Sequence, residues 1–182
     1  MSDELPDDLA WVAALPEAGS PTTDGTGSSH GTPRHGADGF LMCSCGQRHW
    51  GLNGAAGLLL WHEGKVLLQH RSEWSHHGST WAFPGGAIDW DETPVEGALR
   101  EFFEETGIAP ESVEVLGTHA YDHLDWRYTS VVGRLIGPEP ELVLNSESLE
   151  LRWIPWEDVP ELPLLEDFRS ALDALTALRP AD

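Results

Sequence analysis

The chain has 182 residues, of which 40% are hydrophobic, and this is enough apolar sequence to bury one sizeable core. Its 31 acidic residues outnumber its 10 basic residues and give a formal net charge of −21, which argues against non-specific binding to nucleic acid or anionic membranes. No apolar run reaches the length of a membrane span, and the first residues lack the pattern of a secretory signal. The composition therefore predicts one main domain in the cytoplasm.

The first 39 residues are expected to lie outside that domain. Residues 5–15 can form a short amphipathic helix, whereas residues 16–39 are rich in Gly, Ser, Thr and Pro and almost free of large apolar side chains. A segment of that composition cannot bury enough apolar surface to offset its ordering entropy. Residues 1–39 are therefore predicted to be a flexible extension that carries one short helix.

Residues 40–53 bring two cysteines and a histidine together in a predicted lead-in hairpin. Cys43 and Cys45 flank a single serine, and His49 follows shortly after them, which looks like half of a zinc knuckle. Structural zinc usually takes four ligands, with about two to four residues between paired cysteines, and the chain has no further cysteine. A histidine of the linker is one candidate for a missing ligand. The preferred interpretation is two reduced thiols, so far less than one zinc per chain is expected.

The apolar stretch over residues 55–71 predicts two strands joined by a His-Glu-Gly turn. A loop that contains His76 and His77 leads from it into a short strand, where Trp81 and Phe83 alternate and one side should face the core. Loop histidines are most often solvated bystanders, although these two could also contact a substrate. The central region is therefore expected to begin as a β-hairpin followed by a loop and a short strand.

A helix is predicted over residues 94–106. Thr93 is a good N-cap, Glu96 completes a capping box with it, and Pro94 suits the first helical position. Gly107 can adopt the left-handed conformation that ends a helix. The glycine at position 97 costs roughly 1 kcal/mol within a helix, so something is expected to pack closely against it. The buried face should consist of Val95, Ala98, Leu99 and Phe102.

The same helix carries three carboxylates that should converge, on Glu101, Glu104 and Glu105. Two unit charges about 4 Å apart repel by roughly 4 kcal/mol at an effective dielectric constant near 20, and such a cluster is most often a solvated acidic face. Here Arg100 stands among the acids, and two adjacent glycines precede the helix. These additions favour a site for a hard divalent cation, which prefers carboxylate and phosphate oxygens.

Further strands are expected over residues 113–116 and 121–136, and another should end in Arg152-Trp153-Ile154. Tyr121 could stack on a nucleobase at the edge of a cleft, but an ordinary position in a sheet explains it equally well. Residues 164–178 predict a closing amphipathic helix, because apolar residues recur at three- and four-residue intervals.

The segment from Gly86 to Ile108 fills every fixed position of a known signature. It reads glycine, five residues, Glu92, seven residues, Arg100-Glu101-Phe102, one residue, Glu104-Glu105, one residue and Gly107-Ile108. The chain therefore resembles the Nudix hydrolase superfamily, with the MutT-type branch as one candidate within it. The resemblance implies an α/β (α+β) fold, the Nudix α/β/α sandwich with a mixed β-sheet between helices, over residues 54–180. Some Nudix enzymes carry a four-cysteine zinc ribbon ahead of this domain, and the lead-in could be a relic of one.

The resemblance also implies roles for individual residues. The Mg²⁺ ligands, with Mn²⁺ as a substitute, would be the Gly85 carbonyl, Glu101, Glu104, Glu105 and an additional acid, Glu147, from a loop shortly before Trp153. Glu92 and Arg100 would orient the helix and its carboxylates through an ion pair, and Glu101 is the first choice of general base. The candidates for substrate contact are His76, His77, Phe83 and Tyr121.

The implied function is Mg²⁺-dependent cleavage of the pyrophosphate bond in a nucleoside diphosphate linked to another moiety, with an oxidised or canonical NTP favoured. An ADP-ribose- or NADH-type pyrophosphatase is the alternative within enzymes. A non-catalytic Nudix domain that senses a ligand is the alternative outside them, and the intact set of acids weighs against it. The expected partner is a small nucleotide; long RNA is the least favoured substrate, no membrane is expected, and a homodimer is left open.

Overall fold

The computed structural model describes residues 36–73, 78–145 and 148–180. The helix expected over residues 5–15 and most of the linker that follows it lie outside the described residues. None of the helices within the described ranges is long and apolar enough to cross a membrane.

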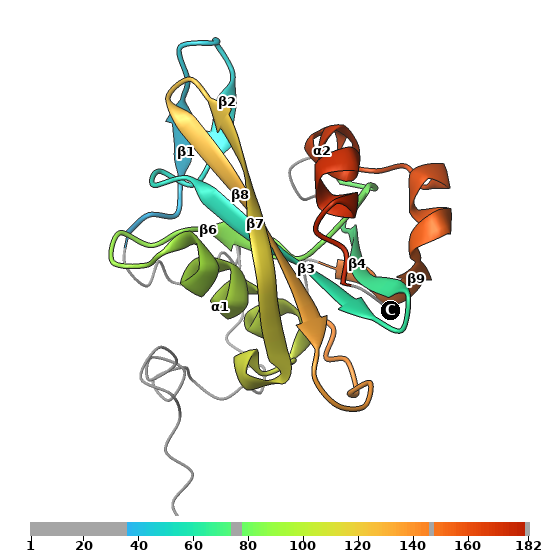
Figure 1. Cartoon of the computed structure of the whole chain (residues 1–182). Helices are drawn as coiled ribbons and strands as arrows, with labels where there is room; N and C mark the ends of the chain where they lie inside the picture. Colours follow the sequence, from blue (N-terminus) through green and yellow to red (C-terminus); the bar gives the residue numbers. More distant parts are fainter. Residues whose placement is uncertain (1–35, 74–77, 146–147, 181–182) are drawn as a thin grey trace, which may run out of the picture.

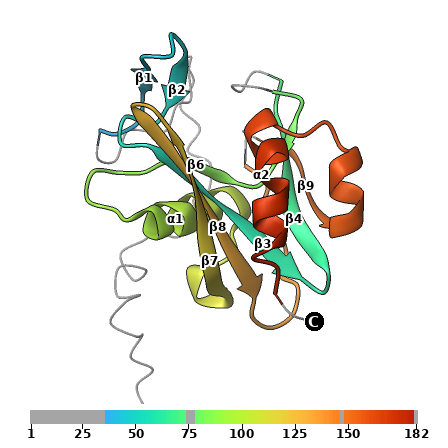
Figure 2. The same ribbon diagram turned by 45° about the horizontal axis from the view of Figure 1, so that its top comes forward.

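A mixed sheet of seven strands forms the centre of the fold, with one long helix on each side of it (Figures 1 and 2). Its strands are β3 (Ala55–His62), β4 (Lys65–Arg71), β5 (Trp81–Ala82), β6 (Gly85–Ala87), β7 (Val113–His123), β8 (Trp126–Leu135) and β9 (Ser148–Pro155). The helices are α1 (Pro94–Thr106), η2 (Pro110–Ser112), η3 (Trp156–Glu161) and α2 (Glu166–Thr176). The predicted layers and mixed sheet are confirmed.

Strand β3 determines where the functional segment lies. It runs parallel to β8 along most of its length, but it pairs with β4 only at the two residue pairs beside the turn. Its N-terminal half pairs instead with β6, in the register Ala55↔Ala87 to Gly57↔Gly85, while β4 pairs with β9. This divergence brings the Gly85–Gly86 segment into the middle of the sheet, directly before α1.

Side chains of β3 enter two hydrophobic cores because successive residues of a strand point to opposite faces. Leu58 and Leu60 belong to the core that includes Leu99 and Phe102 of α1. Leu59 and Trp61 belong to the core on the other face, which is closed by α2. Full burial of each large apolar side chain contributes roughly 1.5–3 kcal/mol, so both helices are held against the sheet.

The strand predicted over residues 121–136 is interrupted. Strand β7 is one continuous strand to His123, Leu124 and Asp125 form a tight turn, and β8 starts at Trp126. Leu124 has a φ of +53°, a left-handed conformation that sequence patterns for leucine do not indicate. The two strands therefore form a long antiparallel hairpin.

A separate two-stranded sheet is formed by β1 (Phe40–Met42) and β2 (Arg48–Trp50). This lead-in hairpin lies beside the turn that joins β7 and β8 (Figure 1). The indole Nε1 of Trp126 donates to the Trp50 carbonyl (2.9 Å), and the Ser44 amide donates to Asp125 Oδ2 (2.7 Å). An isolated two-stranded hairpin is marginal in water, and these contacts attach it to the main sheet.

Candidate functional site

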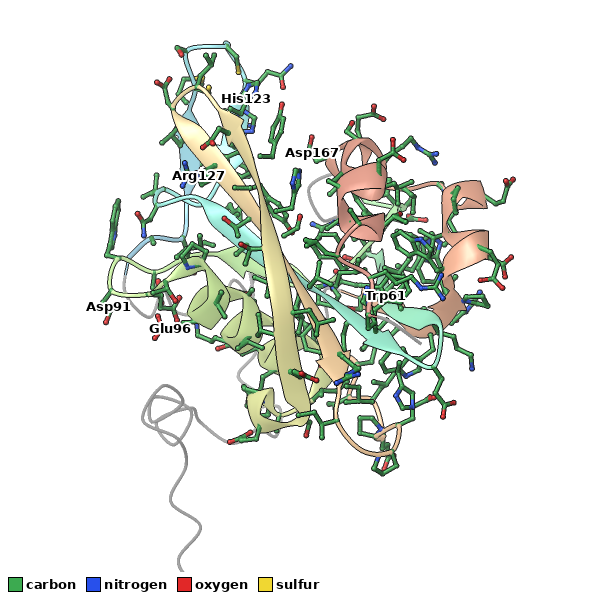
Figure 3. The ribbon with its side chains drawn as sticks, in the orientation of Figure 1. Trp61, Asp91, Glu96, His123, Arg127 and Asp167 are labelled. Carbon is green, nitrogen blue, oxygen red and sulfur yellow. The ribbon has the colours of Figure 1, made fainter. Side chains whose placement is uncertain are left out.

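Helix α1 begins and ends where its capping residues predict. Thr93 Oγ1 accepts a hydrogen bond from the Glu96 amide, and the Glu96 carboxylate accepts one from the Thr93 amide (2.7 Å). Gly107 has a φ of +75° and donates its N–H to the Phe103 carbonyl. Figure 3 shows Glu96 at this N-terminal end, away from the sheet. The local sequence therefore sets the ends of the helix, and the resulting helical register sets the positions of its carboxylates.

Arg100 is the centre of a buried network at the site. Its guanidinium donates from Nε and Nη2 to the two carboxylate oxygens of Glu92 (2.6 and 2.9 Å). Nη2 also donates to the Ala87 carbonyl (2.9 Å), and Nη1 donates to Glu101 Oε1 (2.6 Å). Burial opposes the positive charge, but the hydrogen bonds and negative charges of Glu92 and Glu101 together outweigh it and raise the pKa of Arg100. The predicted ion pair between Glu92 and Arg100 is present, and Glu104 lies 4.0 Å from the same guanidinium.

Glu101 lies against Gly86, which with Gly85 forms the glycine pair of strand β6 that precedes the helix. A Cβ placed on Gly86 would lie 2.5 Å from the Glu101 carboxyl carbon, so the absence of a side chain there makes room for this carboxylate. Burial raises the pKa of Glu101 to about 7, although the neighbouring Arg100 acts in the opposite direction. The carboxyl group therefore exchanges its proton near neutral pH while no cation is bound.

Glu105 is held on the buried side of the helix. Its carboxylate accepts a hydrogen bond from the Gly85 amide (2.9 Å) and another from Gln69 Nε2 (3.3 Å). Gln69 also donates to Ser148 Oγ (2.7 Å), which lies 3.1 Å from Asn145 Oδ1. Sequence reasoning missed Gln69. Its signal is one amide side chain directly after the apolar residues Val66–Leu68 of β4, where a buried polar group needs a partner.

The close packing expected at Gly97 is present. A Cβ at this position would lie 3.2 Å from Glu92 Oε2 and 3.5 Å from the Ile88 Cα. The helix therefore approaches the preceding loop closely, and the approach lets Glu92 reach both Arg100 and the Asp89 amide (3.0 Å).

Of the four residues predicted to contact substrate, the structure describes Phe83 and Tyr121. The Phe83 ring is 5% exposed and packs edge-on against Phe168 in the core, so it is not available to stack on a substrate base. Its position follows from strand alternation into the α2 face. Tyr121 is exposed, but its hydroxyl lies 3.1 Å from His123 Nδ1. Residues His76, His77 and Glu147 lie outside the described residues.

The donor set at the site fits a hard divalent cation. Glu101, Glu104 and Glu105 present carboxylates within two turns of one helix, and the glycine pair brings backbone atoms against two of them. Glu104 is the most accessible of the three, with a side chain 32% exposed. Hard cations select carboxylate, carbonyl and phosphate oxygens, and this combination supplies such ligands.

Comparison with known proteins agrees with the fold. The model of the NUDIX domain family matches residues 51–175, so the chain belongs to the Nudix hydrolase family. It is 42% identical over 156 residues to a Mycobacterium tuberculosis protein provisionally named 8-oxo-dGTP diphosphatase 3, a match that covers 78% of this chain and 70% of that protein.

Two further proteins are similar to the chain. The crystal structure of a Nudix hydrolase from M. smegmatis, RenU, has a TM-score of 0.73 and 40% identity, covering 80% of this chain and 98% of that one. A Bifidobacterium longum fusion protein of a nucleoside triphosphate pyrophosphatase and a Nudix hydrolase is 45% identical over 140 residues. That match covers 70% of this chain but 28% of the fusion protein.

Proposed function

We propose that the chain is a Mg²⁺-dependent hydrolase that cleaves the pyrophosphate bond of a nucleoside triphosphate, with a canonical or an oxidised base, to a nucleoside monophosphate and pyrophosphate. The observation that carries the proposal is the carboxylate arrangement on α1: Glu101 and Glu104 lie beside Arg100, and Glu105 accepts from the Gly85 amide. The relative named for 8-oxo-dGTP hydrolysis supports the choice of substrate class, because the similarity extends over 78% of this chain.

Bound Mg²⁺ or Mn²⁺ would neutralise phosphate charge, acidify a water and stabilise the leaving group. Glu101, Glu104, Glu105 and the Gly85 carbonyl are the groups that would hold it. Arg100 limits the movement of Glu101 through a 2.6 Å contact, and the Gly85 amide and Gln69 fix Glu105. A protein of net charge −21 offers little attraction to a polyphosphate by itself, so the cation is needed for binding as well as for chemistry.

The reaction adds water to a phosphorus atom and breaks one P–O–P bridge. Glu101 is our choice of general base. Its position against Gly86 keeps it beside the glycine pair that would meet the polyphosphate. Arg100 and Glu92 are positioning residues, because they act through the carboxylates.

The experiment is a nucleotide panel with Mg²⁺: the canonical dNTPs and NTPs, 8-oxo-dGTP, ADP-ribose and NADH. We expect monophosphate and pyrophosphate from one or more triphosphates, and no turnover without a divalent cation. Glu104→Gln should abolish most of the activity, whereas the control Glu96→Gln should not, because glutamine also completes a capping box. Turnover confined to ADP-ribose or NADH would overturn the substrate class, and no turnover of any compound would support a sensor.

A further inference from the structure

Four metal-ligating side chains meet at the junction between the lead-in hairpin and the β7–β8 hairpin. Cys43 and Cys45 lie in the turn after β1, His49 lies in β2 and His123 ends β7, and one ligand atom from each lies within 4.8 Å of all the others. Tetrahedral zinc bonds sulfur at about 2.3 Å and nitrogen at about 2.0 Å, so its ligand atoms lie roughly 3.3–3.8 Å apart. Cys45 Sγ and His49 Nε2 are already 3.7 Å apart.

This cluster changes the ligand count on which the expectation of two reduced thiols was based. That expectation rested on an incomplete set of ligands near Cys43, with a linker histidine as the candidate to complete it. The fourth ligand instead comes from His123, which is 80 residues from Cys43 along the chain. The pairing of β7 with β8 and the docking of the lead-in hairpin bring it there. The ligand count is therefore four among the described residues.

The two ring nitrogens of His123 have different surroundings. Its Nδ1 lies 3.1 Å from the Tyr121 hydroxyl, which fixes the ring, while its Nε2 is buried and has no hydrogen-bond partner among the described residues. A buried nitrogen left unsatisfied costs about 1–3 kcal/mol, and a cation among the thiols would remove that cost. Metal-bound histidines characteristically hold the second ring nitrogen in this way.

The turn between β1 and β2, which carries Cys43 and Cys45, also suits two thiolates. Gly46 has a φ of +85° and donates its N–H to the Cys43 carbonyl (2.9 Å), which closes the turn. The Gln47 amide points at Cys45 Sγ (3.4 Å), and an N–H donor stabilises a negatively charged sulfur. The His49 ring stacks on Trp126 at 4.6 Å between centroids, so the histidine on β2 is held toward the cluster.

We propose that Cys43, Cys45, His49 and His123 bind one structural Zn²⁺ that fastens the lead-in hairpin to the β7–β8 hairpin. Figure 3 shows His123 at this junction, beside the lead-in hairpin and remote from α1. All four positions of a tetrahedral ion are filled by protein, which is the pattern of structural rather than catalytic zinc. Two thiolates also balance the charge of the ion. The proposal does not depend on the proposed hydrolase function.

The direct test is elemental analysis of the full chain, purified without chelators. We expect about one zinc per chain, and less than about a tenth of that in the Cys43→Ser/Cys45→Ser double variant and in His123→Ala. His119→Ala is the matched control, because His119 lies on the same face of β7 but outside the cluster. Glu104→Gln should also keep the zinc, which separates this site from the carboxylates of α1.

Two measurements do not depend on the ligand variants folding. Replacement of zinc by Co²⁺ in the unmodified chain should produce thiolate-to-metal absorption bands, and bound metal should protect both thiols from a thiol reagent. Tyr121→Phe should weaken zinc binding by about 10–100-fold, with little change in secondary structure. Fully reactive thiols in the presence of equimolar zinc, or zinc retained after loss of both cysteines, would overturn the proposal.

Discussion

Two adjacent glycines of β6, Gly85 and Gly86, should respond in opposite ways to the same small substitution. In Gly86→Ala, the new Cβ would meet the Glu101 carboxyl carbon at 2.5 Å, about 1 Å inside an ordinary contact. This carboxylate is the end of a flexible side chain, so it can move away without displacing backbone, and we expect a smaller loss of stability than at Gly85. The movement breaks its 2.6 Å contact with Arg100 and displaces a proposed metal ligand. A misplacement of about 1 Å at a reacting centre can cost around 100-fold in rate.

In Gly85→Ala, the new Cβ would meet backbone atoms instead. The Ala56 carbonyl oxygen and the Gly57 Cα would both lie at 2.4 Å, and both belong to the central strand β3. A strand in the middle of the sheet cannot swing aside, so we expect overpacking to cost about 1–3 kcal/mol of stability. Thermal unfolding and steady-state hydrolysis of the best panel substrate, measured on both variants, separate the two effects. The reasoning fails if Gly86→Ala keeps full activity, or if it melts well below Gly85→Ala.

The remaining predictions concern α1. Glu104→Gln should lower kcat by at least 10²-fold at an unchanged melting temperature, because its side chain is the most exposed of the three carboxylates. Glu105→Gln should lower stability as well as activity, since an amide cannot accept from both Gly85 and Gln69 as the carboxylate does. The pKa of Glu101 is raised from 4.5 to about 7 in the folded, metal-free protein, so the stability of that state should fall as pH rises between those values. Because Mg²⁺ must displace the proton from Glu101, the Mg²⁺ affinity measured by calorimetry should fall about tenfold per pH unit below 7. Phe102→Ala, which removes a ring that is 1% exposed, should cost about 3–5 kcal/mol in denaturant titration.

The functional helix could be predicted because its determinants are local. Thr93, Glu96 and Gly107 define its ends within one turn of each, and helical spacing then places the carboxylates. The ion pair of Glu92 with Arg100 follows from the same register and from the close approach at Gly97. Each of these inferences needs only neighbours along the chain or the geometry of one helix.

The other parts of the molecule depend on pairings between distant segments. Gln69 meets Glu105 only because β3 and β4 diverge and β4 pairs with β9, and no periodicity in the sequence encodes that divergence. His123 reaches the cysteines only through the turn at Leu124, whose left-handed conformation is unusual for a leucine. Phe83 packs against Phe168 in the α2 core, and its place in the sequence beside the glycine pair does not indicate which core its ring enters.

Hydrogen bonds join the segment after β2 to the loop that positions Glu92. The segment after β2 donates from Asn53 Nδ2 to the Asp89 carbonyl (3.0 Å), and the Gly54 carbonyl accepts from the Ile88 amide (3.1 Å). The Asp89 amide in turn donates to Glu92 (3.0 Å), which holds Arg100.

Because the lead-in hairpin runs directly into this segment, a metal that fixes the hairpin also restrains the loop that positions Glu92. The hairpin therefore has a physical connection to the carboxylates of α1, although its proposed ligands take no part in the reaction. The position of this loop matters because its Glu92 holds the Arg100 guanidinium, which also contacts Glu101 and Glu104.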